Sequence, residues 1–258
     1  MNDVVAAEWR KLWAIRSTLN VLGVVVVFFA LCVLWSWYVR GYWDGLSAER
    51  RAGLRTAAAD QPLLLVLPVC AAVLGALSIT SEYGTGMIRT SLAAVPRRRN
   101  LFAAKAAVSS GVMLVAALVS AAAAVLAGRA VVGGRAVPSF HAPLSDQAPH
   151  LLSVGIFAAA SALMALGLGA VLRSTAATIT AVLVGMLVVP NMMNVIPAPW
   201  GERLWSFMPA SLPEQIATTP GSRPDVGALS PVAASALLVL YVAVALGAGA
   251  FCLTRRDA

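Results

Sequence analysis

The stretch "LNVLGVVVVFFALCVLWSWYV" at residues 19–39 contains no formally charged residue, and its length decides the fold class. A helix rises 1.5 Å per residue, so about twenty residues cross the roughly 30 Å hydrocarbon core of a bilayer. Soluble domains seldom contain an uncharged apolar run of this length. The stretch therefore predicts a transmembrane helix.

Similar apolar runs recur along the chain, and we expect five further spans, at 62–80, 102–127, 151–172, 176–196 and 232–253. Of the 258 residues, 60% are hydrophobic and only 12% are charged, against about 25% charged in a soluble domain. We predict an all-α, polytopic membrane protein with a single six-span domain over 1–258. The small pairs Gly167/Gly169 and Gly247/Gly249 would allow close helix packing, and Lys105 is expected to snorkel to the interface.

The lysines and arginines predict the orientation in the membrane. With both termini inside, eleven basic residues lie on the cytoplasmic side: Arg10, Lys11, Arg16, Arg89, Arg97, Arg98, Arg99, Lys105, Arg173, Arg255 and Arg256. Eight lie outside: Arg40, Arg50, Arg51, Arg55, Arg129, Arg135, Arg203 and Arg223. The excess inside predicts a multi-pass membrane protein with cytoplasmic termini. The Ala- and Arg-rich composition is typical of a high-GC bacterium, so we expect this membrane to be the bacterial cell membrane. In this setting the net charge of +8 indicates membrane lipid as a partner rather than nucleic acid.

The segment before the first span, "VVAAEWRKLWAIRSTLN" at 4–20, has the pattern of a helix lying in the membrane interface. Val5, Trp9, Leu12 and Trp13 share one helical face, which we expect to lie at headgroup depth. This helix is either a simple membrane anchor or an anchor that also contacts a cytoplasmic partner.

Between the second and third spans lies "ITSEYGTGMIRTSLAAVPRRRNLFAAK" at 79–105. Ser81 can cap a helix, with Glu82 in its first turn, and Ile88, Leu92 and Val95 form an apolar stripe. Pro96 ends this helix, because the residue before a proline disfavours the α region. The sequence predicts a bend at Gly84 and Gly86, then a short helix held between two spans.

This segment resembles the loop after the second span of ABC-2 type transporter permeases, especially those of actinobacteria. The family pattern S-E-[YW]-x-x-G-[TM]-[IL]-R, followed by P-R-R and A-K, matches at Ser81, Glu82, Tyr83, Gly86, Met87, Ile88, Arg89, Pro96, Arg97, Arg98, Ala104 and Lys105. The opening "AEWRKLWAIRSTLNVL" is similar to the start of that family at Glu8, Trp9, Lys11, Leu12, Arg16, Ser17 and Thr18. A weaker likeness is "FMPASLPEQI" at 207–216, where Leu212, Pro213 and Glu214 depart from the family.

The resemblance implies an all-α permease subunit of an ATP-driven exporter. Its coupling helix would contact a separate ATP-binding subunit through Ser81, Glu82, Tyr83, Gly86, Met87, Ile88, Arg89 and Leu92. Its connecting helix would include Glu8, Trp9, Lys11, Leu12 and Arg16. ATP and Mg²⁺ would be bound by that partner, and a second permease chain, identical or related, would complete the pathway. The resemblance also implies short re-entrant helices in the outer segment 197–231.

The sequence contains no G-x-x-x-x-G-K-[ST] motif, so we expect no ATPase site, no catalytic residue and no cofactor in this chain. His141, Asp146 and His150 could form a metal site, but a plain surface loop is the favoured interpretation. Thr178, Asn191 and Asn194 could line a pathway or make interhelical hydrogen bonds.

Three functions compete at this point. The exporter subunit explains the interfacial helix, the coupling helix and the absence of an acidic residue inside a span, which disfavours ion-coupled transport. A non-transporting scaffold or sensor subunit would use the same helices. A membrane enzyme acting on lipids would need convergent catalytic groups that the sequence does not supply.

Overall fold

The computed structural model describes residues 2–14, 16–87, 98–193, 195–218 and 227–255. Within these residues, six helices are long and apolar enough to cross a membrane. They are α2 (Arg16–Asp44), α4 (Gln61–Thr85), α6 (Arg98–Val132), α8 (Leu144–Leu172), the composite helix Thr175–Met193, and α13 (Pro231–Arg255). Each contains one of the predicted spans or nearly all of it. The predicted all-α, six-span fold is confirmed.

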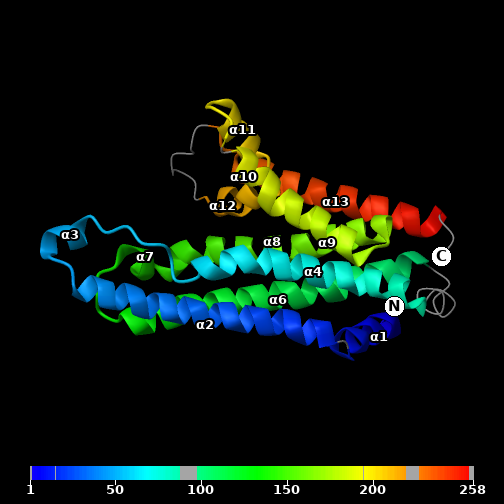
Figure 1. Ribbon diagram of the computed structural model, residues 1–258, viewed down its shortest axis with the longest axis horizontal. Helices are drawn as coiled ribbons and strands as arrows, with labels where there is room; N and C mark the ends of the chain where they lie inside the picture. The colour runs from blue at the N-terminus through cyan, green and yellow to red at the C-terminus, as the bar shows by residue number, and fades with distance from the viewer. Residues whose placement is uncertain (1, 15, 88–97, 194, 219–226, 256–258) are drawn as a thin grey trace.

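The long helices form a bundle in which α8 has the central position. It packs against α4, α6 and α13, and Figure 1 shows α2 and α6 on one side of it with α13 on the other. Both described ends of the chain lie at the same end of the bundle (Figure 1). The short helices α3 (Ala48–Ala52) and α7 (Pro138–His141) lie at the opposite end. An even number of crossings places the termini on one side, as predicted.

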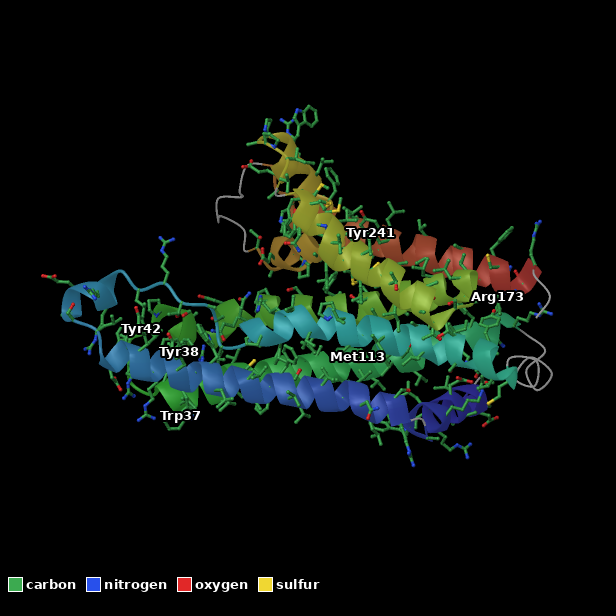
Figure 2. The ribbon with its side chains drawn as sticks, in the orientation of Figure 1. Trp37, Tyr38, Tyr42, Met113, Arg173 and Tyr241 are labelled. Atoms are coloured by element: carbon green, nitrogen blue, oxygen red, sulfur yellow. The ribbon has the colours of Figure 1, made fainter. Side chains whose placement is uncertain are left out.

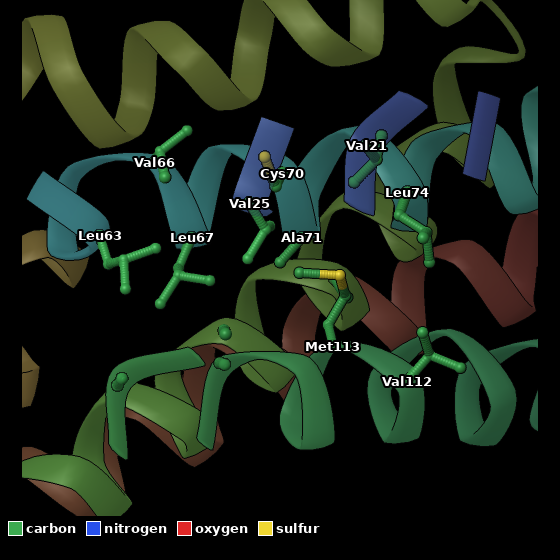
Figure 3. Close-up of a cluster of buried hydrophobic side chains, with 14 of the residues drawn as sticks. Val21, Val25, Leu63, Val66, Leu67, Cys70, Ala71, Leu74, Val112 and Met113 are labelled. Atoms are coloured by element: carbon green, nitrogen blue, oxygen red, sulfur yellow. The ribbon is translucent and has the colours of Figure 1, made fainter. Parts of the chain in front are cut away.

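The largest core cluster joins α2, α4, α6 and α8. In Figure 3, Met113 of α6 points toward Leu67 and Ala71 of α4, with Val25 of α2 beside them. Met113 and Leu67 are fully buried. In lipid there is little hydrophobic driving force between helices, so this interior is held together by van der Waals packing of small and branched side chains.

Three glycines bring helices into backbone contact. A Cβ on Gly75 of α4 would stand 2.1 Å from the carbonyl oxygen of Ala162 in α8. A Cβ on Gly167 would stand 2.3 Å from the Ala245 oxygen of α13, and Gly249 faces Gly167 from that helix. Gly247, by contrast, has no atom within 4 Å of the position of its Cβ. The expectation of close packing therefore holds for Gly167 and Gly249 but not for Gly247.

The fifth span is not a continuous α-helix. It consists of α9 (Thr175–Leu183), the π-helical turn η1 (Val184–Val188) and α10 (Val189–Met193). Pro190 follows the π turn, and its nitrogen carries no hydrogen to complete an α-helical bond to Met186. The structure accommodates the proline by a wider turn just before it.

The segment between the fifth and sixth spans folds into short helices, as the resemblance implied. These are α11 (Trp200–Ser206), the 3-10 turn η2 (Pro209–Ser211) and α12 (Leu212–Ala217). The buried side chain of Gln215 holds them together: its Nε2 donates to Ser206 O at 2.9 Å, and its Oε1 accepts from Leu229 N at 2.7 Å. Leu212 is fully buried, and α12 packs on α8 and α13. That these helices re-enter the membrane stays a prediction.

Aromatic side chains gather near the end of α2 that is remote from the termini. Figure 2 shows Trp37, Tyr38 and Tyr42 along this end of the helix. Tyr38 stacks on Tyr42 with ring centroids 6.2 Å apart, and all three side chains are exposed. Such rings are enriched where hydrocarbon meets water, so they indicate the depth of one membrane interface.

Candidate functional site

Four charged side chains from three helices meet near the end of the bundle that carries the termini. Glu8 and Lys11 lie on α1 (Asn2–Ala14), Glu82 lies in the last turn of α4, and Lys105 lies in the first part of α6. The Lys105 Nζ is 2.8 Å from Glu8 Oε2 and 2.7 Å from Glu82 Oε1. The Lys11 Nζ is 2.9 Å from Glu8 Oε1 and 3.0 Å from Glu82 Oε1. We call these four residues the ion cluster.

The ion cluster is largely removed from solvent. Lys105 is 3% exposed, Glu82 5% and Glu8 6%, whereas the Lys11 side chain is 34% exposed. Two ammonium groups balance two carboxylates, and Lys105 makes a third hydrogen bond to Ser78 O at 3.1 Å. A buried charge is tolerated when it is both paired and hydrogen-bonded, and Lys105 meets both conditions.

Lys11 is the member of the ion cluster nearest to solvent. Partial burial by itself would lower its pKa, but hydrogen bonds to Glu8 and Glu82, and their negative charges, outweigh that effect. The pKa of Lys11 is therefore raised above its ordinary value, and its ammonium is present at physiological pH.

Local structure explains how α1 supplies two members of the ion cluster. Glu8 and Lys11 stand three residues apart, which places both on one face of a helix. Leu12 is 8% exposed and belongs to the main core cluster, with Val5 packed against it. The helix is thus held against the bundle by the apolar residues Leu12 and Val5 and by two charged ones.

This arrangement corrects the predicted face of the N-terminal helix. Trp9 and Trp13 do face outward, at 48% and 40% exposure, but Leu12 turns toward the bundle together with Glu8 and Lys11. The sequence pattern assigned all apolar residues to one membrane-facing side. The helix is instead oriented by ion pairs of Glu8 and Lys11 with Lys105 of α6 and Glu82 of α4. These partners come close to α1 only in the folded protein.

The structure also corrects the start of the predicted coupling helix. The helix α4 continues through Thr85, so Ser81 does not cap a new helix; its hydroxyl donates to Leu77 O at 2.6 Å. Glu82 is buried in the ion cluster and does not belong to an exposed contact surface. The chain turns at Gly86, whose φ of 72° places it in the left-handed region that favours glycine. A break at this glycine agrees with the sequence.

Of the remaining predicted contact residues, Met87 is exposed and follows directly after the turn at Gly86. Tyr83 lies under the guanidinium of Arg173, which is 5.2 Å from its ring centroid. Figure 2 shows Arg173 at the end of the bundle that carries the termini. Ile88, Arg89 and Leu92 lie outside the described residues, as do Val95, Pro96 and Arg97. The contact surface for a partner therefore stays a prediction.

A third correction concerns Lys105. Its position near the start of an apolar span predicted a side chain that snorkels to the interface. Instead, Lys105 is turned into the protein by two carboxylates and the Ser78 carbonyl. The one signal in the sequence was a lysine placed slightly too deep in an apolar run, with no acidic partner on its own helix.

The candidate pathway residues are placed as follows. Thr178 is fully buried, and its hydroxyl donates to Ser174 O at 2.7 Å, within the first turn of α9. Asn191 is exposed and donates to Leu187 O at 2.7 Å. Asn194 lies outside the described residues. Both described side chains satisfy backbone carbonyls of their own span.

The candidate metal ligands of the outer loop are not brought together. His141 contacts the Gly133 carbonyl at 2.9 Å, whereas His150 contacts the buried Asp60 at 2.9 Å. Asp146 interacts with Ser145 at 3.1 Å. Among the described residues, no group of three or more His, Cys, Asp or Glu side chains is placed to hold a metal ion. The contact between His150 and Asp60 instead connects α8 to the start of α4, and no pattern in the sequence predicted this contact.

Comparison with known proteins adds an independent observation. A family model described as ABC-2 family transporter protein matches residues 4–191, which include the N-terminal helix, the ion cluster and most of five spans. A search of curated proteins finds no match. Because the family match covers more than half of the chain and agrees with its six apolar helices, the chain belongs to the ABC-2 family of transporter membrane proteins.

Proposed function

We propose that this chain is the membrane-spanning permease subunit of an ATP-driven exporter. ATP and Mg²⁺ are bound by a separate ATPase subunit, and two permease chains, identical or related, form the pathway. Both termini are cytoplasmic, so the ion cluster lies on the side where the ATPase binds. Membership of the ABC-2 family supports this function, while the direction of transport and the composition of the complex are part of the proposal.

The ion cluster is the observation that carries the mechanism. Residues 86–97 separate α4 from α6, and the ion cluster holds both helices just beside this segment through Glu82 and Lys105. Glu8 adds the N-terminal helix to the same unit. A force applied to the segment is therefore delivered to α1, α4 and α6 together. We propose that ATP-driven closure of the ATPases moves these three helices as one body.

Buried ion pairs suit this role better than apolar contacts. Their geometry is specific, because a carboxylate that slides away from an ammonium leaves an uncompensated buried charge. The ion pairs thus hold α1, α4 and α6 in one register without the need for large interlocking apolar side chains. Since α4 also packs closely on α8 through Gly75, displacement of α4 reaches the central helix of the bundle.

The first test is co-purification. The tagged chain is solubilised from its native host, and bound proteins are identified by mass spectrometry. The variants Met87→Glu and Arg89→Glu are compared with Asp44→Asn, a control at the opposite end of the bundle. We expect a P-loop ATPase with the wild type and the control, and less of it with the other two. If no ATPase is recovered while other membrane complexes survive, the proposal is wrong.

A second test separates a transporter from a scaffold or sensor. The chain and its ATPase are reconstituted in proteoliposomes, and ATP hydrolysis is measured with and without Lys105→Met. A permease coupled through the ion cluster predicts that binding of the ATPase survives this substitution while stimulation of hydrolysis is lost. Hydrolysis that is independent of the permease chain would favour the scaffold.

A further inference from the structure

A second feature of the same end of the molecule is a wide apolar groove between α2 and α6. Its volume is about 680 Å³, and it is walled by Val25 and Phe29 of α2 and by Val112 and Val115 of α6. Along the groove, α6 contributes small residues: Gly111, Ala116, Ser120 and Ala123. A Cβ on Gly111 would meet no atom within 4 Å.

The length of the groove matches one leaflet of a bilayer. From Gly111 to Ala123 an α-helix rises about 18 Å, and half of the hydrocarbon core is about 15 Å thick. An acyl chain that enters at one interface could therefore lie in the groove along its whole length.

The interfacial end of the groove is marked by α1. Trp9 and Trp13 line it, and their rings meet edge to face with centroids 5.7 Å apart. Arg10 is exposed one helical turn before Trp13, and Arg16 is exposed at the start of α2. Glu8, the nearest acidic residue on α1, is buried in the ion cluster. The exposed charged residues closest in sequence to Trp9 and Trp13, Arg10 and Arg16, are thus both positive.

We propose that this groove is a binding site for an anionic phospholipid. One acyl chain lies between α2 and α6, the tryptophans pack against the glycerol region, and Arg10 and Arg16 bind the phosphate head group. Ion pairing between the head group and these arginines favours an anionic lipid over a zwitterionic one. A lipid bound here would hold α1, which carries half of the ion cluster, against α2 and α6. This inference does not depend on the transport function.

The test is native mass spectrometry of the purified chain after exchange into detergent with equal amounts of phosphatidylglycerol and phosphatidylcholine. We expect the wild type to retain phosphatidylglycerol preferentially. Gly111→Phe and Ser120→Phe fill the groove from two positions, and each should abolish the retention. Ala107→Phe lies on an exposed part of α6 outside the groove and should retain the lipid as the wild type does.

The head group is tested separately. Near a membrane surface each arginine contributes about five-fold in affinity for anionic lipid, so Arg10→Gln/Arg16→Gln should reduce the preference by about twenty-five-fold. Lipid retained by this variant without head-group preference would support the assignment of both parts of the site. Equal retention of the two lipids by the wild type, or full retention by both groove variants, would overturn the proposal.

Discussion

Replacement of Lys105 by methionine tests whether the ion cluster is a buried unit. Methionine keeps an unbranched side chain of similar length, replaces one methylene by sulfur and removes the ammonium. Three acceptors each lose one hydrogen bond: Glu8 Oε2 at 2.8 Å, Glu82 Oε1 at 2.7 Å and Ser78 O at 3.1 Å. Of these, Glu82 Oε1 keeps the Lys11 ammonium at 3.0 Å. Two carboxylates then share the single charge of Lys11, and one negative charge is left uncompensated.

The expected cost follows from burial. Removal of one partner from a buried ion pair destabilises a protein by about 3–5 kcal/mol, because the remaining charge is left without compensation. An exposed pair contributes only about 0–1 kcal/mol. Since Lys105 is 3% exposed, the first range applies. We expect Lys105→Met to lower the free energy of unfolding by about 3–5 kcal/mol.

A double variant makes the prediction sharper. Glu82→Gln/Lys105→Met leaves Glu8 paired with Lys11 at 2.9 Å and restores the balance of charge. The two substitutions should therefore be less destabilising together than the sum of their separate effects, by about 0.5–3 kcal/mol. Strict additivity would contradict a direct interaction between these side chains.

The assay is unfolding of the purified chain in mixed detergent micelles, followed by far-ultraviolet circular dichroism as the fraction of denaturing detergent is raised. Asp44→Asn serves as a matched control, because it removes the exposed ion pair with Arg135 at the opposite end. We expect Asp44→Asn to change the free energy of unfolding little, and we expect this small effect to decrease further at high salt. A loss below about 1 kcal/mol for Lys105→Met would mean that the ion cluster is hydrated, and would refute its role as a rigid link.

Three further predictions concern packing, pH and the outer segment. Gly167→Ala should destabilise the chain by about 1–3 kcal/mol, because its Cβ would meet a backbone oxygen of α13 at 2.3 Å. Gly247→Ala should be neutral or stabilising, because no atom lies within 4 Å of its Cβ position. The same unfolding assay measures both variants, and equal effects would contradict close packing of α8 on α13 at Gly167. The raised pKa of Lys11 gives a stabilisation that is complete below the unfolded pKa of 10.5 and is lost as pH rises through the folded pKa. The free energies of unfolding of the wild type and of Lys11→Met should therefore become equal at strongly alkaline pH. Gln215→Leu leaves Leu229 N without its acceptor, so amide hydrogen exchange in α12 should become faster. Unchanged exchange would show that the hydrogen bonds of Gln215 do not hold these short helices together.

The sequence was sufficient for the fold class because its signals are local. A helix such as 19–39 can be assigned from its own residues, since length, absence of charge and bilayer thickness are enough. The turn at Gly86 was predicted in the same way, because it follows from the backbone chemistry of one residue. The ABC-2 likeness also depended on short continuous motifs, and the family match agrees with it at the level of the family.

The site was read incompletely, for a physical reason. Glu8, Glu82 and Lys105 lie on three helices that are far apart in the chain, and a single charge near the end of a span looks the same whether it faces water or another charge. The amphipathic pattern placed Leu12 on the membrane-facing side of its helix. The family resemblance placed Glu82 on a surface that contacts a partner, and the position of Lys105 near the start of a span predicted a side chain that snorkels. Only the packing of α1, α4 and α6 brings Glu8 and Glu82 within 3 Å of the Lys105 ammonium. The sequence thus determined which helices form and that they cross a membrane, whereas tertiary structure decided which charges are buried together, because ion pairing between helices depends on distances that no local pattern encodes.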